Sequence, residues 1–113
     1  RNTEALWLGN MGSMYSRLRR DDEAQAHYQQ ALEIAREIGD KHGEANHLYN
    51  LGQFYLQRDE KQRAIELLQS ARDIFAALNL QHQVGLCDRN IDMAQNDRPS
   101  PFRRRFFEDD PDK

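Results

Sequence analysis

The chain has little of what membrane, disulfide-stabilised or nucleic-acid-binding proteins need. Its one cysteine among 113 residues cannot form a disulfide within the chain, which fits a reducing compartment. No apolar run approaches the roughly 20 residues that cross a bilayer, and the sequence shows no hydrophobic region of a signal peptide. The net charge of −3 gives no general attraction to nucleic acid or anionic membranes. We therefore expect a cytoplasmic protein with no nucleic-acid partner and no membrane partner.

Helix-breaking residues are also scarce, and strand patterns are absent. There are three prolines, all beyond residue 96, and six glycines. Apolar residues recur at spacings of three and four, which is typical of amphipathic helices. The pattern predicts an all-α chain with helices over about 3–18, 22–38, 41–57, 61–78 and 81–96. The helical pattern begins soon after Arg1, and the sequence has no initiator methionine, so we expect a fragment of a longer protein.

Residues recur along the chain at a step of 40 positions. Ten of 40 positions are identical when the sequence is shifted by that step, and most of them are small or apolar. The identical pairs are Glu4/Glu44, Ala5/Ala45, Leu8/Leu48, Asn10/Asn50, Gly12/Gly52, Tyr15/Tyr55, Ala24/Ala64, Gln29/Gln69, Ala31/Ala71 and Ile34/Ile74. A period of this length is typical of a solenoid of stacked supersecondary units.

Asparagine extends this recurrence to a third position. Asn10, Asn50 and Asn90 follow one another at the same step. Stacking explains recurrent apolar residues, but asparagine is a mediocre helix former with no apolar surface to contribute. The three amides therefore predict a row of hydrogen-bonding groups that faces something outside the repeat.

Helix ends recur in the same register. Gly39 is suited to the left-handed conformation that ends a helix, and Asn79 occupies the equivalent place one repeat later. Asp21 or Asp22 is placed to cap the N-terminus of the second helix.

Two glycines lie in the middle of predicted helices, where each is about 1 kcal/mol less favourable than alanine. Gly12 and Gly52 share one register, so we expect close contact between helices there. Ala24 and Ala64 are the expected opposing small residues. Each pair of helices should therefore form an antiparallel hairpin.

Two copies of a motif resemble the tetratricopeptide repeat. In that repeat the first helix carries Trp or Leu, then Leu-Gly, then Tyr, and the second helix carries Ala and then Phe or Tyr. The matching residues are Leu8, Met11, Gly12, Tyr15, Ala24, Tyr28 and Ala31, and then Leu48, Leu51, Gly52, Tyr55, Ala64, Leu68 and Ala71. The resemblance covers residues 3 to 78 and implies a right-handed superhelical solenoid of antiparallel helix hairpins. The long step is similar to that of repeats in kinesin light chains, spindle-orientation adaptors and bacterial peptide-sensing regulators.

The resemblance divides the chain into a repeat domain, residues 1–96, and a tail, residues 97–113. The repeats cover about 3–40 and 41–80, and a helix over 81–96 caps them. In that helix Asp88, Asp92 and Gln95 replace the Leu, Gly and Tyr of the motif, and prolines follow it. A polar outer face suits the terminal element of a solenoid.

In the resembling families the asparagine of the first helix lines a concave groove and bonds the main chain of an extended peptide. This role carries over to Asn10, Asn50 and Asn90. A carboxamide offers one acceptor and two donors, so it pairs with a peptide unit whatever the side chain of the ligand. The alternative is that these amides cap or bridge adjacent helices within the array.

Residues one helical turn from each asparagine share its face. The candidate peptide-binding residues beside the asparagines are Arg17, Asn46, Tyr49, Gln53 and Arg89, with Leu6, Ser13, Gln57, Leu86 and Met93 on the same faces. This groove is polar and uncharged at its centre, which favours a neutral or mildly acidic peptide. The lysine-rich clamp that holds C-terminal carboxylates in some of these domains is not reproduced, because Gly9 and Ser13 occupy two of its positions.

No pattern indicates catalysis, a metal, a cofactor or a small-molecule substrate. His42 and His82 share one repeat position, and no two histidines have the i, i+4 spacing of a helical zinc pair. Cys87 lies on an apolar face, so we interpret it as a small buried hydrophobe rather than a nucleophile.

The tail combines three phenylalanines with basic and acidic runs. Residues 103–105 are arginines, and the acidic run 108–112 nearly balances them, which weakens a nucleic-acid interpretation. A short helix starting at Pro101 would let Phe102 and Phe106, with Phe107 beside them, cover the fifth helix or dock onto another copy. The alternative is a disordered terminus.

The sequence thus favours a non-enzymatic adaptor or scaffold that binds a protein segment in its concave face. One alternative is an assembly element that forms homo-oligomers through exposed repeat ends or through the phenylalanine tail. Another is a regulatory sensor domain of a larger signalling protein.

Overall fold

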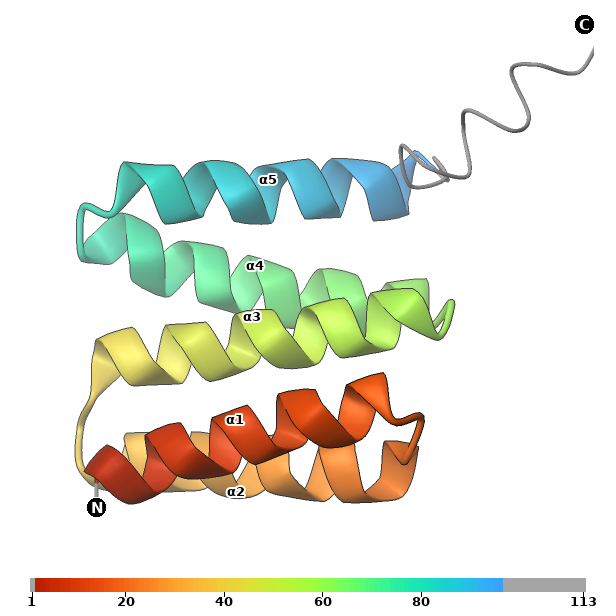
Figure 1. Cartoon of the computed structure of the whole chain (residues 1–113). Helices are drawn as coiled ribbons and strands as arrows, with labels where there is room; N and C mark the ends of the chain where they lie inside the picture. Colours follow the sequence, from red (N-terminus) through yellow and green to blue (C-terminus); the bar gives the residue numbers. More distant parts are fainter. Residues whose placement is uncertain (1, 97–113) are drawn as a thin grey trace, which may run out of the picture.

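The computed structural model describes residues 2–96 and contains five helices in this range, with no strand (Figure 1). They are α1 (Asn2–Arg17), α2 (Asp21–Glu37), α3 (Lys41–Gln57), α4 (Lys61–Ala77) and α5 (Gln81–Gln95). The predicted number of helices is confirmed, and their predicted bounds are correct to within one residue. The tail residues Phe102, Phe106 and Phe107 lie outside the described residues.

All four loops are three residues long and are built in the same way. The middle residue of each has a positive φ: 64° at Arg19, 71° at Gly39, 64° at Asp59 and 64° at Asn79. In the first loop the N–H of Arg20 donates to the carbonyl of Tyr15 at 2.9 Å, and the other loops repeat this bond. This is the Schellman arrangement that ends many helices. The predicted left-handed residues Gly39 and Asn79 are confirmed.

Short loops make consecutive helices antiparallel neighbours, and the structure is a stack of such hairpins (Figure 1). α1 packs on α2, and α3 packs on α4, which forms the two hairpins. α2 also packs on α3 and α4 on α5, which joins the hairpins. In addition α1 contacts α3, and α3 contacts α5. The first helices of successive repeats therefore lie next to one another.

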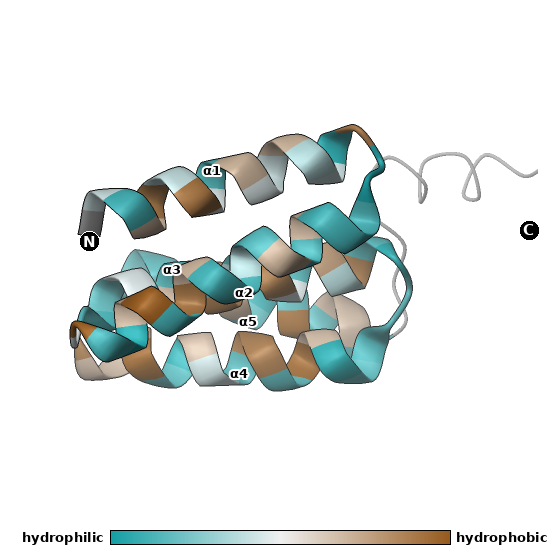
Figure 2. Ribbon diagram, turned by 90° about the horizontal axis from the view of Figure 1, so that it is seen from below, coloured by the Kyte–Doolittle hydropathy of each residue, from teal (hydrophilic) through white to brown (hydrophobic). Residues whose placement is uncertain are grey.

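The hydrophobic core follows the amphipathic faces of these helices (Figure 2). Its larger part runs from α2 to α5 and includes Tyr28, Leu48, Leu68, Phe75 and Cys87. A smaller cluster of Ala5, Leu8, Ala31 and Ile34 joins α1 to α2. Burial of each large apolar side chain contributes roughly 1.5–3 kcal/mol, so interhelical packing is the main source of stability.

The mid-helix glycines do mark close contacts, but the opposing residues differ from those expected. A Cβ on Gly12 would lie 2.9 Å from the ring of Tyr28. A Cβ on Gly52 would lie 2.7 Å from Cγ of Leu68 and 3.4 Å from the carbonyl oxygen of Ala64. Tyr28 rather than Ala24 is therefore nearest to Gly12, and Leu68 is nearer to Gly52 than Ala64 is. A large side chain one turn along the second helix fills the space that each glycine leaves.

The predicted N-cap of α2 is wrong. The cap position is Arg20, whose side chain makes no capping hydrogen bond, and Asp21 already lies within the helix. A side-chain cap is found instead at α3, where Asp40 accepts a hydrogen bond from the N–H of Gly43 at 2.9 Å. Asp21 is used differently, because its carboxylate binds Arg58 at the end of α3.

Charged pairs link the hairpins at their edges. Arg36 at the end of α2 donates to Glu44 in the first turn of α3 at 3.0 Å. Arg72 of α4 donates to Asp88 of α5. Asp88 stands where the two preceding repeats have Leu8 and Leu48, and it is exposed while both leucines are buried. Within residues 2–96, no helix has both the length and the apolar character needed to cross a membrane.

Candidate peptide-binding site

The first helices α1, α3 and α5 form the wall on which the candidate residues were predicted. α1 approaches α3 closely where Gly9 faces His47, since a Cβ on Gly9 would lie 2.9 Å from the imidazole ring. α3 and α5 are joined by a hydrogen bond between Tyr49 and Asn90. Residues about 40 positions apart are thus brought together on neighbouring helices, as the repeat requires.

Tyr49 is the centre of a small polar network on this wall. Its hydroxyl accepts a hydrogen bond from the side-chain amide of Gln53 at 3.1 Å and another from that of Asn90 at 3.2 Å. The amide of Asn90 also donates to the carbonyl of Leu86, one turn earlier on α5, at 2.9 Å. Three of the predicted site residues, Tyr49, Gln53 and Asn90, therefore lie together.

These bonds use both amide hydrogens of Asn90, which leaves only its carbonyl oxygen for a ligand. At this position the bridging alternative describes the structure, because the side chain holds α5 against α3. Asn90 therefore differs from the other two asparagines of the row.

Asn10 and Asn50 keep their amides unengaged. Asn10 is exposed and Asn50 is half-buried. Neither side chain forms a hydrogen bond to another residue within the described range 2–96. Each offers two donors and one acceptor on adjacent first helices.

The other predicted residues are more dispersed. Asn46 is half-buried, and its amide lies 3.3 Å from the Nδ1 atom of His42 on the same helix. Arg17 and Arg89 are exposed, Arg17 at the end of α1 and Arg89 on α5. Ser13, expected on the same face, instead contacts the hydroxyl of Tyr28 at 2.9 Å within its own hairpin.

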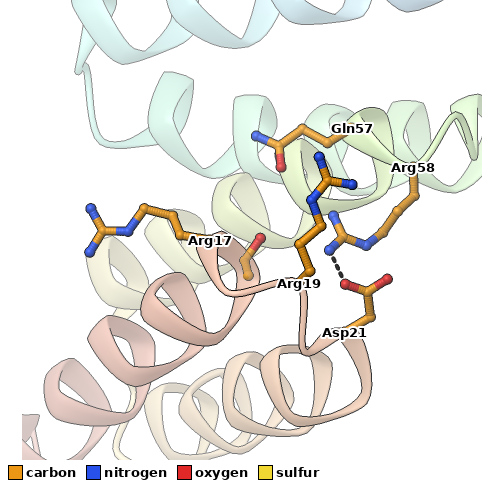
Figure 3. A pocket seen from close by; sticks show the side chains of 6 residues that line it. Arg17, Arg19, Asp21, Gln57 and Arg58 are labelled. Atoms are coloured by element: carbon orange, nitrogen blue, oxygen red, sulfur yellow. Dashed lines mark hydrogen bonds and ion pairs between the residues drawn. The ribbon is translucent and has the colours of Figure 1, made fainter.

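A polar pocket of about 390 Å³ lies where α1 and α3 end (Figure 3). Its lining residues are Ser16, Arg17, Arg19, Asp21, Gln57 and Arg58. Arg17 and Gln57 are also residues that the sequence predicts on the groove face. The other charged residues of the pocket were not anticipated. One feature of the sequence points to them. The repeat register places the turns 18–20 and 58–60 on the same edge, and both turns are rich in charged residues.

Arg58 is the fixed element of this pocket. Its guanidinium lies 4.0 Å from the ring centroid of Phe54 and binds the carboxylate of Asp21 at the start of α2. The hydrogen bond from Arg58, and then its charge together with that of Arg19, lower the pKa of Asp21 below its usual value. Asp21 is therefore ionised at neutral pH and orients Arg58.

Two titratable groups are buried near the wall. Burial raises the pKa of the Cys87 thiol to about 11, so the thiolate needed for nucleophilic chemistry is disfavoured. The interpretation of Cys87 as a buried hydrophobe is confirmed, since none of it is exposed. Burial lowers the pKa of His47, although Asp40 opposes this, and its Nδ1 atom has no hydrogen-bond partner in the described part of the chain. Among residues 2–96, no three His, Cys, Asp or Glu side chains are grouped as metal ligands.

Comparison with known families agrees with this architecture. The tetratricopeptide repeat family model matches residues 3–77, which is more than half of the chain. The chain belongs to the tetratricopeptide repeat family. No curated protein and no solved structure gave a significant match.

The family fixes the class of the protein. Its repeats form helical solenoids that serve as protein-interaction modules, and the five stacked helices have this form. The predicted family and fold are therefore confirmed. The closer likeness to the long repeats of kinesin light chains stays a prediction.

Proposed function

We propose that this domain is a non-enzymatic adaptor or scaffold that binds an extended peptide segment along the wall of α1, α3 and α5. One observation carries the proposal. Asn10 and Asn50 occupy one repeat position on adjacent helices, and neither amide is used within residues 2–96. Recurrent amides that stabilise nothing inside the repeat are suited to the main chain of a ligand.

The amides alone give weak binding. Each net hydrogen bond contributes about 0.5–1.5 kcal/mol, so two or three correspond to millimolar affinity at best. Additional contacts must come from side chains on the same wall. Tyr49 supplies the aromatic surface that is enriched in binding sites, and Asn46 and Gln53 supply further polar groups.

The charge of the wall defines the chemistry of the partner. Arg17 and Arg89 are exposed on it, while the central residues Asn50 and Gln53 are neutral. A neutral or mildly acidic peptide fits this distribution, with its acidic residues near the arginines. The proposed function needs no cofactor, metal, nucleic acid, membrane or small-molecule substrate. We propose a cytoplasmic location for the protein.

The test begins with selection of binding peptides from a displayed library of random peptides against residues 1–113. A selected peptide is then titrated against the wild type and Asn50→Ala, with Gln69→Ala as the control. Gln69 is an exposed amide on α4, away from the wall. We expect Asn50→Ala to weaken binding about tenfold and Gln69→Ala to leave it unchanged. Equal affinity of all three proteins would contradict the proposal.

A second candidate function, self-association, is favoured by an apolar stripe on α1. Trp7 is 57% exposed, and Met14 and Leu18 are also exposed. The equivalent side chains one repeat later are buried, since His47 is 6% exposed and Phe54 is 3% exposed. In α3 this face is buried against the preceding hairpin, whereas within the described residues nothing covers it in α1. We propose that a second copy covers it in a two-fold contact.

Sedimentation velocity over a range of concentrations tests this candidate. The wild type should form dimers as concentration rises, and Trp7→Ser should remain monomeric. Leu78→Ser is the control, because it removes an exposed leucine at the opposite end of the stack. A wild type that stays monomeric at every concentration refutes self-association and leaves the peptide-binding proposal unaffected.

A further inference from the structure

The pocket at the ends of α1 and α3 has an unbalanced charge. It contains three arginines, Arg17, Arg19 and Arg58, and a single carboxylate, that of Asp21. Asp21 is bound to Arg58, so that pair is internally neutralised. No acidic group within residues 2–96 forms a salt bridge with Arg17 or Arg19, although the charge of Arg19 acts on Asp21. Two positive charges therefore remain in the pocket of a chain whose overall charge is negative.

The side chains of Arg19 and Arg58 converge from two different loops. Arg19 is the left-handed residue of the first loop, and its side chain extends towards the end of α3 (Figure 3). Figure 3 shows its guanidinium beside Arg58 and Gln57, which come from the end of α3. Arg58 is held in this place by the ring of Phe54 and by Asp21. Two like charges thus stand together, and Asp21, which binds Arg58, is the one carboxylate among the lining residues.

Arg17 borders the same pocket from the end of α1. In Figure 3 its side chain extends away from Arg19 and Arg58. Exposed side chains change rotamer within picoseconds to nanoseconds, so an anion in the pocket recruits Arg17 by side-chain rotation alone. The backbone need not move.

We propose that this pocket binds the phosphoryl group of a phosphorylated peptide. The inference rests on the proposed peptide-binding function and assigns one end of the groove to a phosphorylated residue. A phosphate monoester carries a charge of about −1.5 to −2 at neutral pH, which matches the two unpaired arginines.

The donors of the pocket favour phosphate over carboxylate. Guanidinium groups bind phosphate oxygens in a bidentate manner. Ser16 and Gln57 add a hydroxyl and an amide donor to those of the arginines. A carboxylate has two oxygens and is satisfied by one guanidinium, whereas the three terminal oxygens of a phosphoryl group can use the whole set. The pocket volume of about 390 Å³ also accommodates the larger anion.

The experiment uses inorganic phosphate as the probe for the pocket. It is titrated at pH 7.5 into nitrogen-15-labelled protein at constant ionic strength, and the backbone and arginine side-chain N–H signals are followed by NMR. We expect saturable shifts at Arg19, Arg58 and Gln57, and little effect of acetate at the same concentrations. Arg19→Gln should weaken phosphate binding about tenfold or more.

Arg63→Gln is the matched control, because it removes the same charge from an exposed arginine on α4 that already pairs with Glu60 at 3.7 Å. An equal loss in Arg19→Gln and Arg63→Gln would show general charge attraction and overturn the proposal. So would equal shifts with acetate and phosphate.

A second arm tests whether the phosphoryl group belongs to a peptide. A groove-binding peptide is prepared with serine or phosphoserine at the end nearest Arg19, and phosphorylation should tighten binding about tenfold in the wild type and not in Arg19→Gln. No effect of phosphorylation would overturn the assignment to a peptide. Asn50→Ala should leave the binding of inorganic phosphate unchanged. Loss of peptide binding in the groove and loss of phosphate binding in the pocket are therefore separate results.

Discussion

The side-chain amide of Asn90 donates a hydrogen bond to the hydroxyl of Tyr49, 3.2 Å away on the neighbouring first helix. This bond separates the third asparagine of the row from the other two. Asn90 fixes α5 against α3, while Asn10 and Asn50 remain available to a ligand. The three asparagines of the row are therefore not equivalent, because within residues 2–96 only Asn90 forms a hydrogen bond to the hydroxyl of Tyr49.

The Tyr49–Asn90 bond should be measurable as a coupling energy. Tyr49→Phe and Asn90→Ala should each lower the free energy of unfolding by about 0.5–1.5 kcal/mol. The double variant should lose less than the sum of the two, because either change alone removes the bond. Urea unfolding of the four proteins gives the answer, and strictly additive losses would show that the bond contributes nothing.

The closeness of the helices within a hairpin is tested at Gly52. Gly52→Ala places a Cβ 2.7 Å from Leu68, and such overpacking costs about 1–3 kcal/mol. This packing cost outweighs the stabilisation of about 1 kcal/mol that alanine provides over glycine within a helix. The variant should therefore be less stable than the wild type. Gly85→Ala is the control, because within residues 2–96 no atom beyond the neighbouring backbone of its own helix lies within 4 Å of the added Cβ. It should be more stable than the wild type by urea unfolding, and a stabilised Gly52→Ala would refute the packing argument.

Two substitutions at equivalent loop positions should have opposite effects on stability, because glycine is favoured at the positive φ of both. Gly39→Ala adds no contact within 4 Å but puts a side chain at a φ of 71°, so it should cost about 1 kcal/mol. Asp59→Gly removes a side chain at a φ of 64° and should stabilise by up to about 1 kcal/mol. For a domain of this size these changes correspond to shifts of roughly 4–8 °C per kcal/mol in Tm. Thermal unfolding measures both changes. A shift of Tm in the same direction in both variants would contradict the assignment of a positive φ to these positions.

The buried imidazole of His47 predicts a pH dependence of stability. Burial lowers its pKa below the ordinary value of 6.5 in the folded state, so the unfolded chain binds a proton more readily. Stability is therefore fully present above about pH 6.5 and falls as pH decreases towards the lowered pKa. His47→Gln should remove this part of the dependence between pH 7.5 and 5. Replacement of the exposed His82 by Gln is the control, and equal effects of the two changes would be inconsistent with the buried position of His47.

Much of the fold was predictable, because it rests on local patterns that the repeat presents twice. Spacings of three and four fixed the helices to within a residue, and Gly39 and Asn79 revealed the left-handed loop positions. Arg19 and Asp59 were missed at the equivalent positions, because arginine rarely adopts a positive φ and aspartate adopts it less readily than glycine. There the three-residue loop geometry overrides local preference.

The site was less predictable, because it depends on distances between helices. The sequence placed Tyr49, Gln53 and Asn90 on one wall, but nothing local shows that Asn90 reaches across to Tyr49. The pocket likewise requires Arg19 and Arg58 from separate turns to converge. Register places both turns on one edge, whereas the path of the Arg58 side chain depends on Phe54 and Asp21.

In the proposed binding mode, the amides of Asn10 and Asn50 contact the main chain of a bound peptide. The side-chain NH₂ signals of asparagine in nitrogen-15 NMR spectra report this directly during titration with a selected peptide. We predict that the signals of Asn10 and Asn50 shift with the same saturation curve, while exposed amides on α2 and α4, such as Gln29 and Gln69, do not move. Shifts confined to α2 and α4, with Asn10 and Asn50 unchanged, would contradict the account.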